Sequence, residues 1–306
     1  MTEVRIPAFA KINLHLDILG KRADGYHELR TIFQTLSLHD DIRLRPSKQP
    51  GISLSILGNT ALASEPIHGN LVYRAVDAVK RKLKISGGVE IQLKKRIPAG
   101  GGLGGGSSDA VAAMLGYLQL TKKKLATVQM LEIAATLGAD VPYFLFGGRA
   151  LGVNRGDEIY PLPDIPKMHL LVVVSNEIRV PTPDAFRWVN AKPIGLTKSP
   201  VDPKLLQFCA LSWSLPAAAG AQGIGLSNDF ETPVFRRHPR LGQIKRVLLQ
   251  KGATEASLAG SGSAVFGLFP SPAMARRAAV GFPHDLTFVC ETLSRDRYAR
   301  RMHIAA

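Results

Sequence analysis

Hydrophobic and polar residues alternate strictly over residues 9–18. On an extended chain, one face would carry apolar side chains and the other polar ones: Ile12, Leu14, Leu16 and Ile18 on the first, Lys11, Asn13, His15 and Asp17 on the second. Successive side chains of a strand point to opposite faces. The pattern therefore predicts a half-buried strand whose polar face is available for chemistry.

The same reading of the rest of the chain gives a mixture of strands and helices. Strands are predicted over residues 28–38, 41–45, 89–93, 149–153, 170–174, 264–269 and 286–290. Helical spacing of apolar residues predicts helices over residues 70–83, 110–120, 127–137, 241–250 and 272–280. Because these elements do not follow a regular βαβ order, we expect an α+β fold.

Prolines become frequent after about residue 156, which indicates a change in organisation. We therefore expect an N-terminal domain over residues 1–155 and a C-terminal domain over residues 156–306. A chain of 306 residues is long enough for two moderate domains.

Composition excludes several classes of protein. With 45% hydrophobic residues and no apolar run near the ~20 residues of a membrane span, neither disorder nor a membrane helix is expected. Cys209 and Cys290 are far apart and lack metal-ligand spacing, so we expect buried thiols rather than a disulfide or zinc site. No targeting leader is visible, and the expected location is cytoplasmic.

The formal net charge is +15, which would suit nucleic acid, an acidic membrane or a phosphorylated small molecule. The basic residues are scattered and no known nucleic-acid module accompanies them. We interpret them as a solvated basic surface and expect no nucleic-acid or membrane partner.

Residues 98–110, Pro-Ala-Gly-Gly-Gly-Leu-Gly-Gly-Gly-Ser-Ser-Asp-Ala, contain six glycines just before a predicted helix. Glycines allow positive φ and close backbone approach, so successive N–H groups can converge on an anion. The following helix adds its own free N–H groups, with Ser107 and Ser108 as capping or phosphate-binding residues. We predict a phosphate-binding loop.

Other types of glycine loop fit less well. The Walker A pattern requires a lysine that is absent here. Gly100, Gly102 and Gly105 match the dinucleotide pattern G-x-G-x-x-G, which leaves a nucleotide-dependent oxidoreductase as an alternative, but no acidic residue ends a strand about 20 residues later. A flexible linker would rarely separate a strand from an apolar helix.

Asp140 follows directly after a predicted helix end in the apolar sequence Ala-Asp-Val-Pro. A carboxylate there would be costly to bury without a partner, and Lys11 on the polar face of the first strand could provide one. Such a pair could lower the pKa of a nearby hydroxyl and accept its proton. Asp140 alone could equally be an ordinary turn residue.

Four segments occur together in one order: residues 8–14, the glycine loop, residues 137–142, and residues 258–263 with the sequence Leu-Ala-Gly-Ser-Gly-Ser. Together they resemble the GHMP kinase superfamily. This resemblance implies a two-domain α+β architecture with the active site in the cleft between the domains, an ATP-dependent reaction with Mg²⁺, and a catalytic pair of Lys11 and Asp140.

The resemblance also assigns binding residues. The expected nucleotide contacts are Pro98, Gly100, Gly101, Gly102, Leu103, Gly104, Gly105, Gly106, Ser107 and Ser108. The expected substrate contacts near the reacting hydroxyl are Asn13, Gly260 and Ser261. Metal ligands are not assigned, the adenine site is placed only near the loop, and a monomer or homodimer is expected.

Residues 22–27 and 181–183 resemble the branch of the superfamily whose small-molecule substrate carries a cytidine diphosphate group. The resemblance assigns Tyr26, His27, Thr182 and Phe186 to the base, because aromatic rings stack on pyrimidines and histidine can bond their edges. Tyr26 and Phe186 could instead be core aromatics. Kinases of the mevalonate or homoserine type remain the alternatives within the superfamily, and a basic nucleic-acid-binding protein remains one outside it.

Overall fold

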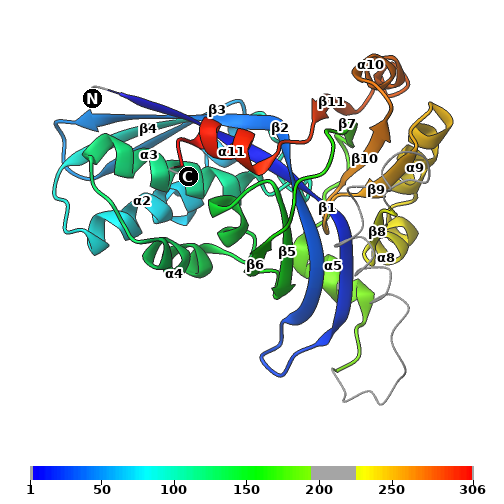
Figure 1. Ribbon diagram of the computed structural model, residues 1–306, viewed down its shortest axis with the longest axis horizontal. Helices are drawn as coiled ribbons and strands as arrows, with labels where there is room; N and C mark the ends of the chain where they lie inside the picture. The colour runs from blue at the N-terminus through cyan, green and yellow to red at the C-terminus, as the bar shows by residue number, and fades with distance from the viewer. Residues whose placement is uncertain (1–2, 194–224, 305–306) are drawn as a thin grey trace.

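The structure is a computed structural model that describes residues 3–193 and 225–304. The fold contains two sheets, and the long first strand belongs to the larger one (Figure 1). The larger sheet has the order β3-β4-β2-β1-β8, and β5 and β6 extend it from β2. Its strands are β1 (Val4–Lys21), β2 (His27–Ser47), β3 (Ile52–Leu57), β4 (Gly88–Lys94), β5 (Arg149–Asn154), β6 (Glu158–Pro161) and β8 (Ser227–Asn228).

The smaller sheet has four strands in the order β11-β7-β10-β9. They are β7 (His169–Val174), β9 (Glu255–Leu258), β10 (Ala264–Phe269) and β11 (Leu286–Glu291). Strand β7 pairs antiparallel with both β10 and β11. The mixture of two sheets and surrounding helices agrees with the predicted α+β class.

Three predicted helices cover the larger sheet: α2 (Leu71–Lys82), α3 (Gly105–Thr121) and α4 (Thr127–Leu137). The smaller sheet packs against two others, α9 (Pro239–Gln250) and α10 (Pro272–Ala279). The sequence pattern missed several short elements. They are α1 (Thr60–Ala63), α5 (Thr182–Val189), α8 (Glu231–Arg237), α11 (Arg295–Met302), the 3-10 turns Ile67–Gly69 and Pro142–Leu145, and strands β3, β6, β8 and β9.

The expectation of two separate strands at residues 28–38 and 41–45 is wrong. Strand β2 runs unbroken through Asp40, which is fully buried. A polar residue usually marks a strand end, but here the Asp40 carboxylate accepts main-chain N–H groups from Arg96 and Ile97, the latter at 2.8 Å. Those bonds compensate for its burial.

The expectation that the first strand is only half-buried is also wrong. From Ala8 to Leu16 every residue of β1 is buried on both faces. Its apolar side chains belong to three successive cores: Phe9 lies in the core under α2 and α3, Ile12 in the core between the sheets, and Leu16 in the core under α9. The polar side chains of β1 are therefore held in enclosed surroundings rather than in solvent.

The chain end returns to the first part of the molecule. Tyr298 and Met302 of α11 are buried in the core under α2 and α3, and Tyr298 Oη donates to the carbonyl of Phe144.

The domain boundary near residue 156 stays a prediction. Cys290 is buried as expected, and burial raises the pKa of its thiol to about 12; Cys209 lies outside the described residues. Among helices of the part described, none could cross a membrane.

Candidate active site

The glycine loop ends at helix α3, which begins at Gly105 rather than at the expected residue 110. Gly104 is the N-cap, in the left-handed region with φ 70°, and it offers no side-chain cap. The expectation that Ser107 or Ser108 caps the helix is therefore wrong, because both lie in its first turn. The first N–H groups of α3 are left free of a side-chain partner, as an anion-binding helix end requires.

Gly104 is required by two close approaches. A Cβ there would lie 2.9 Å from Cγ of Lys11 and 2.8 Å from Cζ of Phe144. The Lys11 main-chain N–H donates to the carbonyl of Leu103 at 2.9 Å. The loop is thus packed directly against strand β1 at its lysine.

The second glycine turn, residues 259–263, packs against the first. A Cβ on Gly102 would lie 1.9 Å from the carbonyl oxygen of Ala259, and one on Gly262 would lie 2.1 Å from the Gly102 nitrogen. Ala264 N–H also donates to the Gly101 carbonyl at 3.1 Å. The resemblance had assigned the second turn to the neighbourhood of the reacting hydroxyl, and its contact with the glycine loop brings both turns to one place.

Lys11 and Asp140 form the expected ion pair, with 3.1 Å between Nζ and Oδ2. Asn13 joins it, because Lys11 Nζ donates to Asn13 Oδ1 at 3.0 Å. Lys11 also lies over the Phe33 ring, 5.3 Å from its centroid. The contacts with Asp140 and Asn13 use two of the three ammonium protons of Lys11, and Lys11 also lines a cavity.

That cavity has a volume of about 400 Å³ and is here called the acceptor cavity. Both glycine turns, strand β1, the α4 end and helix α5 contribute to it. Of the predicted residues, its lining includes Lys11, Asn13, Gly102, Gly104, Ser107, Asp140, Thr182, Phe186, Gly260 and Ser261. The structure therefore assembles residues from most of the chain around one space of substrate size.

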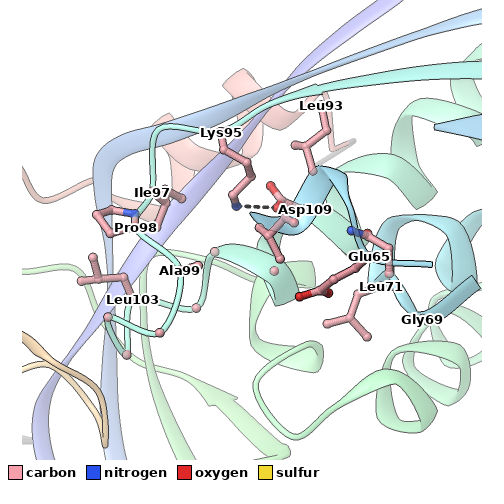
Figure 2. A pocket seen from close by; sticks show the side chains of 18 residues that line it. Glu65, Gly69, Leu71, Leu93, Lys95, Ile97, Pro98, Ala99, Leu103 and Asp109 are labelled. Atoms are coloured by element: carbon pink, nitrogen blue, oxygen red, sulfur yellow. Dashed lines mark hydrogen bonds and ion pairs between the residues drawn. The ribbon is translucent and has the colours of Figure 1, made fainter. Parts of the chain in front are cut away.

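A second cavity of about 310 Å³ lies on the other side of the glycine loop (Figure 2). Its lining includes Pro98, all six loop glycines and Leu103, together with Asn70 and Leu71 at the start of α2. Asn70 caps that helix by accepting from the Val72 N–H at 2.9 Å. We call it the nucleotide cavity, because it lies beside the loop where the adenine site is expected; adenine binding there stays a prediction.

Ser108 does not reach either cavity lining. Its side chain is fully buried, and Oγ finds no hydrogen-bond partner among the described residues. Ser107, one residue earlier on the helix, lines the acceptor cavity instead. The two serines therefore separate, with Ser107 placed for a ligand and Ser108 directed into the protein.

An ion cluster holds both ends of the glycine loop at the base of the nucleotide cavity (Figure 2). Lys95 Nζ contacts Asp109 Oδ2 of α3 at 2.7 Å and also binds Asp40. Asp40 in turn accepts the N–H groups that lead into the loop. Burial raises the pKa of Asp109 to about 8, with the Asp40 carboxylate adding to the shift against the lysine. Sequence reasoning missed this cluster, because its three residues come from separate segments.

The residues expected to bind a base are only partly gathered. The His27 and Phe186 rings are stacked, with centroids 4.7 Å apart and 22° between planes. Phe186 also meets the buried Phe230 edge-on at 4.9 Å. Tyr26 is 56% exposed at the tip of the β1–β2 hairpin, with the Arg155 guanidinium 5.0 Å from its ring centroid. Phe186 and Thr182 line the acceptor cavity, whereas Tyr26 and His27 do not.

His27 is suited to neutral hydrogen bonding. Partial burial and the charge of Lys21 lower the pKa of its imidazole. A neutral imidazole has one donor and one acceptor nitrogen. Arg155, which sequence reasoning did not select, lines the acceptor cavity and is held by Asp157 with 2.9 Å between Nε and Oδ2.

The segment at residues 228–231 is structural. Asn228 Nδ2 donates to the carbonyls of Leu258 and Gly260 at 2.9 and 2.8 Å. Asp229 Oδ2 accepts from the Ile18 N–H at 2.9 Å. These bonds fix the second glycine turn against strand β1.

Comparisons with known proteins agree with this arrangement. Residues 70–148 match the GHMP kinases N terminal domain, and residues 215–284 match the GHMP kinases C terminal domain. A 4-diphosphocytidyl-2-C-methyl-D-erythritol kinase from Solibacter usitatus (strain Ellin6076) is 43% identical over 95% of this chain and 89% of its own length. The chain belongs to the 4-diphosphocytidyl-2-C-methyl-D-erythritol kinase family.

Other relatives support the same assignment. The enzyme of this name from Citrifermentans bemidjiense (strain ATCC BAA-1014 / DSM 16622 / JCM 12645 / Bem) is 38% identical over 91% of this chain and 94% of its own. A crystal structure of 4-(cytidine 5'-diphospho)-2C-methyl-D-erythritol kinase matches with TM-score 0.76 and 34% identity, covering 94% and 99% of the two chains. A homoserine kinase from Cytophaga hutchinsonii, at 21% identity and TM-score 0.71, shares the fold.

Membership in this family confirms several predictions. The protein is a kinase with the two-domain α+β architecture of the GHMP kinases. The oxidoreductase and nucleic-acid-binding alternatives fall away, since neither matches the family. As a member of the family, the chain performs an ATP-dependent phosphorylation in isoprenoid synthesis.

Proposed function

We propose that this protein transfers the γ-phosphoryl group of ATP to the 2-hydroxyl of 4-diphosphocytidyl-2-C-methyl-D-erythritol. The observation that carries the proposal is the Lys11–Asp140 ion pair at the wall of the acceptor cavity, beside the two packed glycine turns. A phosphoryl acceptor placed there would have a base, a cation and a phosphate-binding loop within one space. Phosphoryl transfer requires mainly this positioning and charge neutralisation.

In the proposed reaction, the substrate hydroxyl oxygen forms a bond to the γ-phosphorus while the bond from that phosphorus to the β–γ bridging oxygen breaks. ADP leaves with the electron pair of the broken bond. The hydroxyl proton passes to the Asp140 carboxylate. Lys11, paired with Asp140, stabilises the developing negative charge.

The glycine loop would hold the nucleotide phosphates. Gly102 and Gly104 have φ 79° and 70°, and the free N–H groups of α3 begin directly after them. Backbone donors in this conformation form an anion-binding concavity. The nucleotide cavity beside Asn70 and Leu71 would take the adenosine part.

Mg²⁺ belongs to the same proposal. In the part of the chain that the structure describes, no group of three or more His, Cys, Asp or Glu side chains could hold a metal ion. The Ser107 hydroxyl is an oxygen donor at the acceptor cavity. Mg²⁺ would be held there by this hydroxyl, by the nucleotide phosphates and by water. When bound, Mg²⁺ would neutralise charge on the phosphates.

The cytidine end of the substrate would lie between helix α5 and the β1–β2 hairpin. Phe186, at the cavity, offers a ring face, and His27 stacked behind it offers a neutral imidazole. Tyr26 at the exposed hairpin tip would offer a further ring face to the base. Thr182 and Ser261, whose hydroxyls are 3.2 Å apart, lie between this region and Lys11.

A coupled ADP-release assay tests the proposal. The protein is supplied with ATP, Mg²⁺ and 4-diphosphocytidyl-2-C-methyl-D-erythritol, and separately with mevalonate and homoserine. We expect turnover only with the cytidine substrate and its loss in Asp140→Ala. Activity with a control substrate alone would exclude the proposed substrate, and unchanged activity in Asp140→Ala would exclude the proposed base.

A further inference from the structure

Behind the Lys11–Asp140 pair, a chain of buried hydrogen bonds continues into strand β2. Lys11 Nζ donates to Asn13 Oδ1 at 3.0 Å, and Asn13 Nδ2 donates to Thr31 Oγ1 at 2.7 Å. Thr31 Oγ1 donates its own proton to the main-chain carbonyl of His15 at 2.6 Å. The three side chains, Lys11, Asn13 and Thr31, are buried, and so is His15; Thr31 is 1% exposed.

The direction of this chain is fixed at its far end. A main-chain carbonyl can only accept, so it takes the single hydroxyl proton of Thr31. Thr31 Oγ1 then presents only lone pairs to Asn13, and the Asn13 amide must turn its NH₂ group toward Thr31. Its carbonyl oxygen is thereby left to face the Lys11 ammonium. With the amide reversed, two donors would meet at Lys11 and two acceptors at Thr31.

A β-bulge lies directly after Asn13 in this arrangement. The β1–β2 register shifts between Asn13, opposite Phe33, and His15, opposite Ile32. A bulge leaves one residue out of the ladder and re-aims neighbouring side chains. Beyond the shift Thr31 lies opposite Leu16, and its hydroxyl meets the Asn13 amide diagonally across the strand pair.

We propose that Thr31 is a positioning residue for phosphoryl transfer, which acts through Asn13 by fixing the amide so that its oxygen holds the Lys11 ammonium beside Asp140. This proposal rests on the proposed function. Thr31 lines the acceptor cavity, but its one hydroxyl proton and a lone pair are already used within the protein. It therefore determines where Lys11 lies rather than binding the substrate in its own right.

The first test does not depend on activity. In protein labelled with ¹⁵N-asparagine, the Asn13 side-chain amide signal is identified by its loss in Asn13→Ala. We expect slow hydrogen exchange of this amide in the unsubstituted protein and in Thr31→Ser, which keeps the hydroxyl. Exchange becomes fast in Thr31→Val, which is nearly isosteric without it. Thr31→Ala removes the same hydroxyl with no added methyl group and serves if the valine variant does not fold.

The second test measures kinetics. We expect kcat to fall about tenfold or more in Thr31→Val, as misplacement of a catalytic group does, with KM for both substrates nearly unchanged because the interaction serves the transition state. Thr31→Ser retains most of the kcat. In an Asn13→Ala background, Thr31→Val costs nothing further, since the two residues act as one unit.

Either of two results would overturn the proposal: an Asn13 amide whose exchange is unaffected by Thr31→Val, or a kcat loss equally large with and without Asn13. If the unsubstituted protein does not phosphorylate the cytidine substrate, the proposed function fails, and the exchange measurement still decides the role of Thr31.

Discussion

The ion pair between Lys11 and Asp140 is asymmetric: the lysine side chain is 4% exposed and the aspartate side chain 36% exposed. The cation is fixed inside the protein by strand β1, and the carboxylate faces the acceptor cavity at the end of α4. In the proposed reaction, the group that receives the substrate proton is thus the accessible member of the pair, and the cation is the enclosed one.

We expect Asp140→Asn to lower kcat by about 10²- to 10⁴-fold, the usual contribution of a general base. KM for ATP should change little, because Asp140 lies on the acceptor side of the loop. Steady-state ADP release measures both quantities. Asp296→Asn, an exposed aspartate on α11, is the matched control. A loss of similar size in the control would contradict the assignment.

Gly104→Ala should lower both stability and kcat. The new Cβ would meet Lys11 Cγ at 2.9 Å, and φ 70° is unfavourable for any side chain. Gly51→Ala is the control, since φ there is 97° but nothing lies within 4 Å of the Cβ. Both variants should lose about 1 kcal/mol of unfolding free energy or more from backbone strain, while only Gly104→Ala loses kcat. Equal kcat in the two variants would contradict the close packing of the loop on Lys11.

Asp17 should be important for stability. It is 1% exposed, lies 2.9 Å from His15 Nε2 and binds Arg30 Nη2 at 2.7 Å. Breaking a buried pair from one side costs about 3–5 kcal/mol, so Asp17→Asn should lower the unfolding free energy by that order in urea titration. Asp24→Asn, which removes an exposed partner of Arg22, should have little effect.

The pH dependence of Asp17 has a definite sign. Burial alone would raise the pKa of this carboxyl, but the bonds from His15 and Arg30 lower it below its ordinary value. A lowered pKa in the folded state gives stability that is present above the unfolded pKa of about 3.9 and is lost as the pH falls through the folded value. The difference in melting temperature between Asp17→Asn and the unsubstituted protein should therefore hold from pH 6 to about 4 and shrink as the pH falls further below about 4. Parallel curves would contradict this.

Asp109 should act in the opposite direction. Its pKa of about 8 in the folded state exceeds the unfolded value of about 3.9. Its contribution to stability is therefore full at low pH and declines as the pH rises from about 4 to 8. Asp109→Asn removes the titration but keeps an acceptor for Lys95. We expect the melting temperature of Asp109→Asn, relative to that of the unsubstituted protein, to rise as the pH is raised from 5 to 9. A constant difference in melting temperature would show that Asp109 does not titrate in this range.

Phe186→Ala should raise KM for the cytidine substrate and leave KM for ATP unchanged. Loss of one stacking partner costs about 1–3 kcal/mol, which corresponds to roughly a 5- to 150-fold rise. Tyr160→Ala, an exposed aromatic on β6, is the control. A rise in KM for ATP instead would move Phe186 to the nucleotide.

The chain itself determined the fold class, most long elements and the chemistry of the site. Alternation in β1, helical spacing in α4 and the glycines before α3 are local patterns, and they predicted the type of each element correctly. Glycine spacing likewise indicated the loop, because glycine meets a backbone requirement that does not depend on distant partners. Asp140 was selected as the proposed base only through the resemblance of several ordered motifs, since its own segment would equally suit a turn residue.

Only the tertiary structure decided which of these parts meet. The bonds from the Arg96 and Ile97 main chain to Asp40, the Lys95–Asp109 contact, the packing of Gly102 on Ala259 and the Asn13–Thr31 bond each join different elements of the fold. From the sequence alone, a polar residue is assigned to a loop or to the surface, because the hydrogen bond that would compensate for its burial comes from another segment. For that reason the sequence could name the lysine and the aspartate, but the packing of the two sheets along one strand determined how they are held.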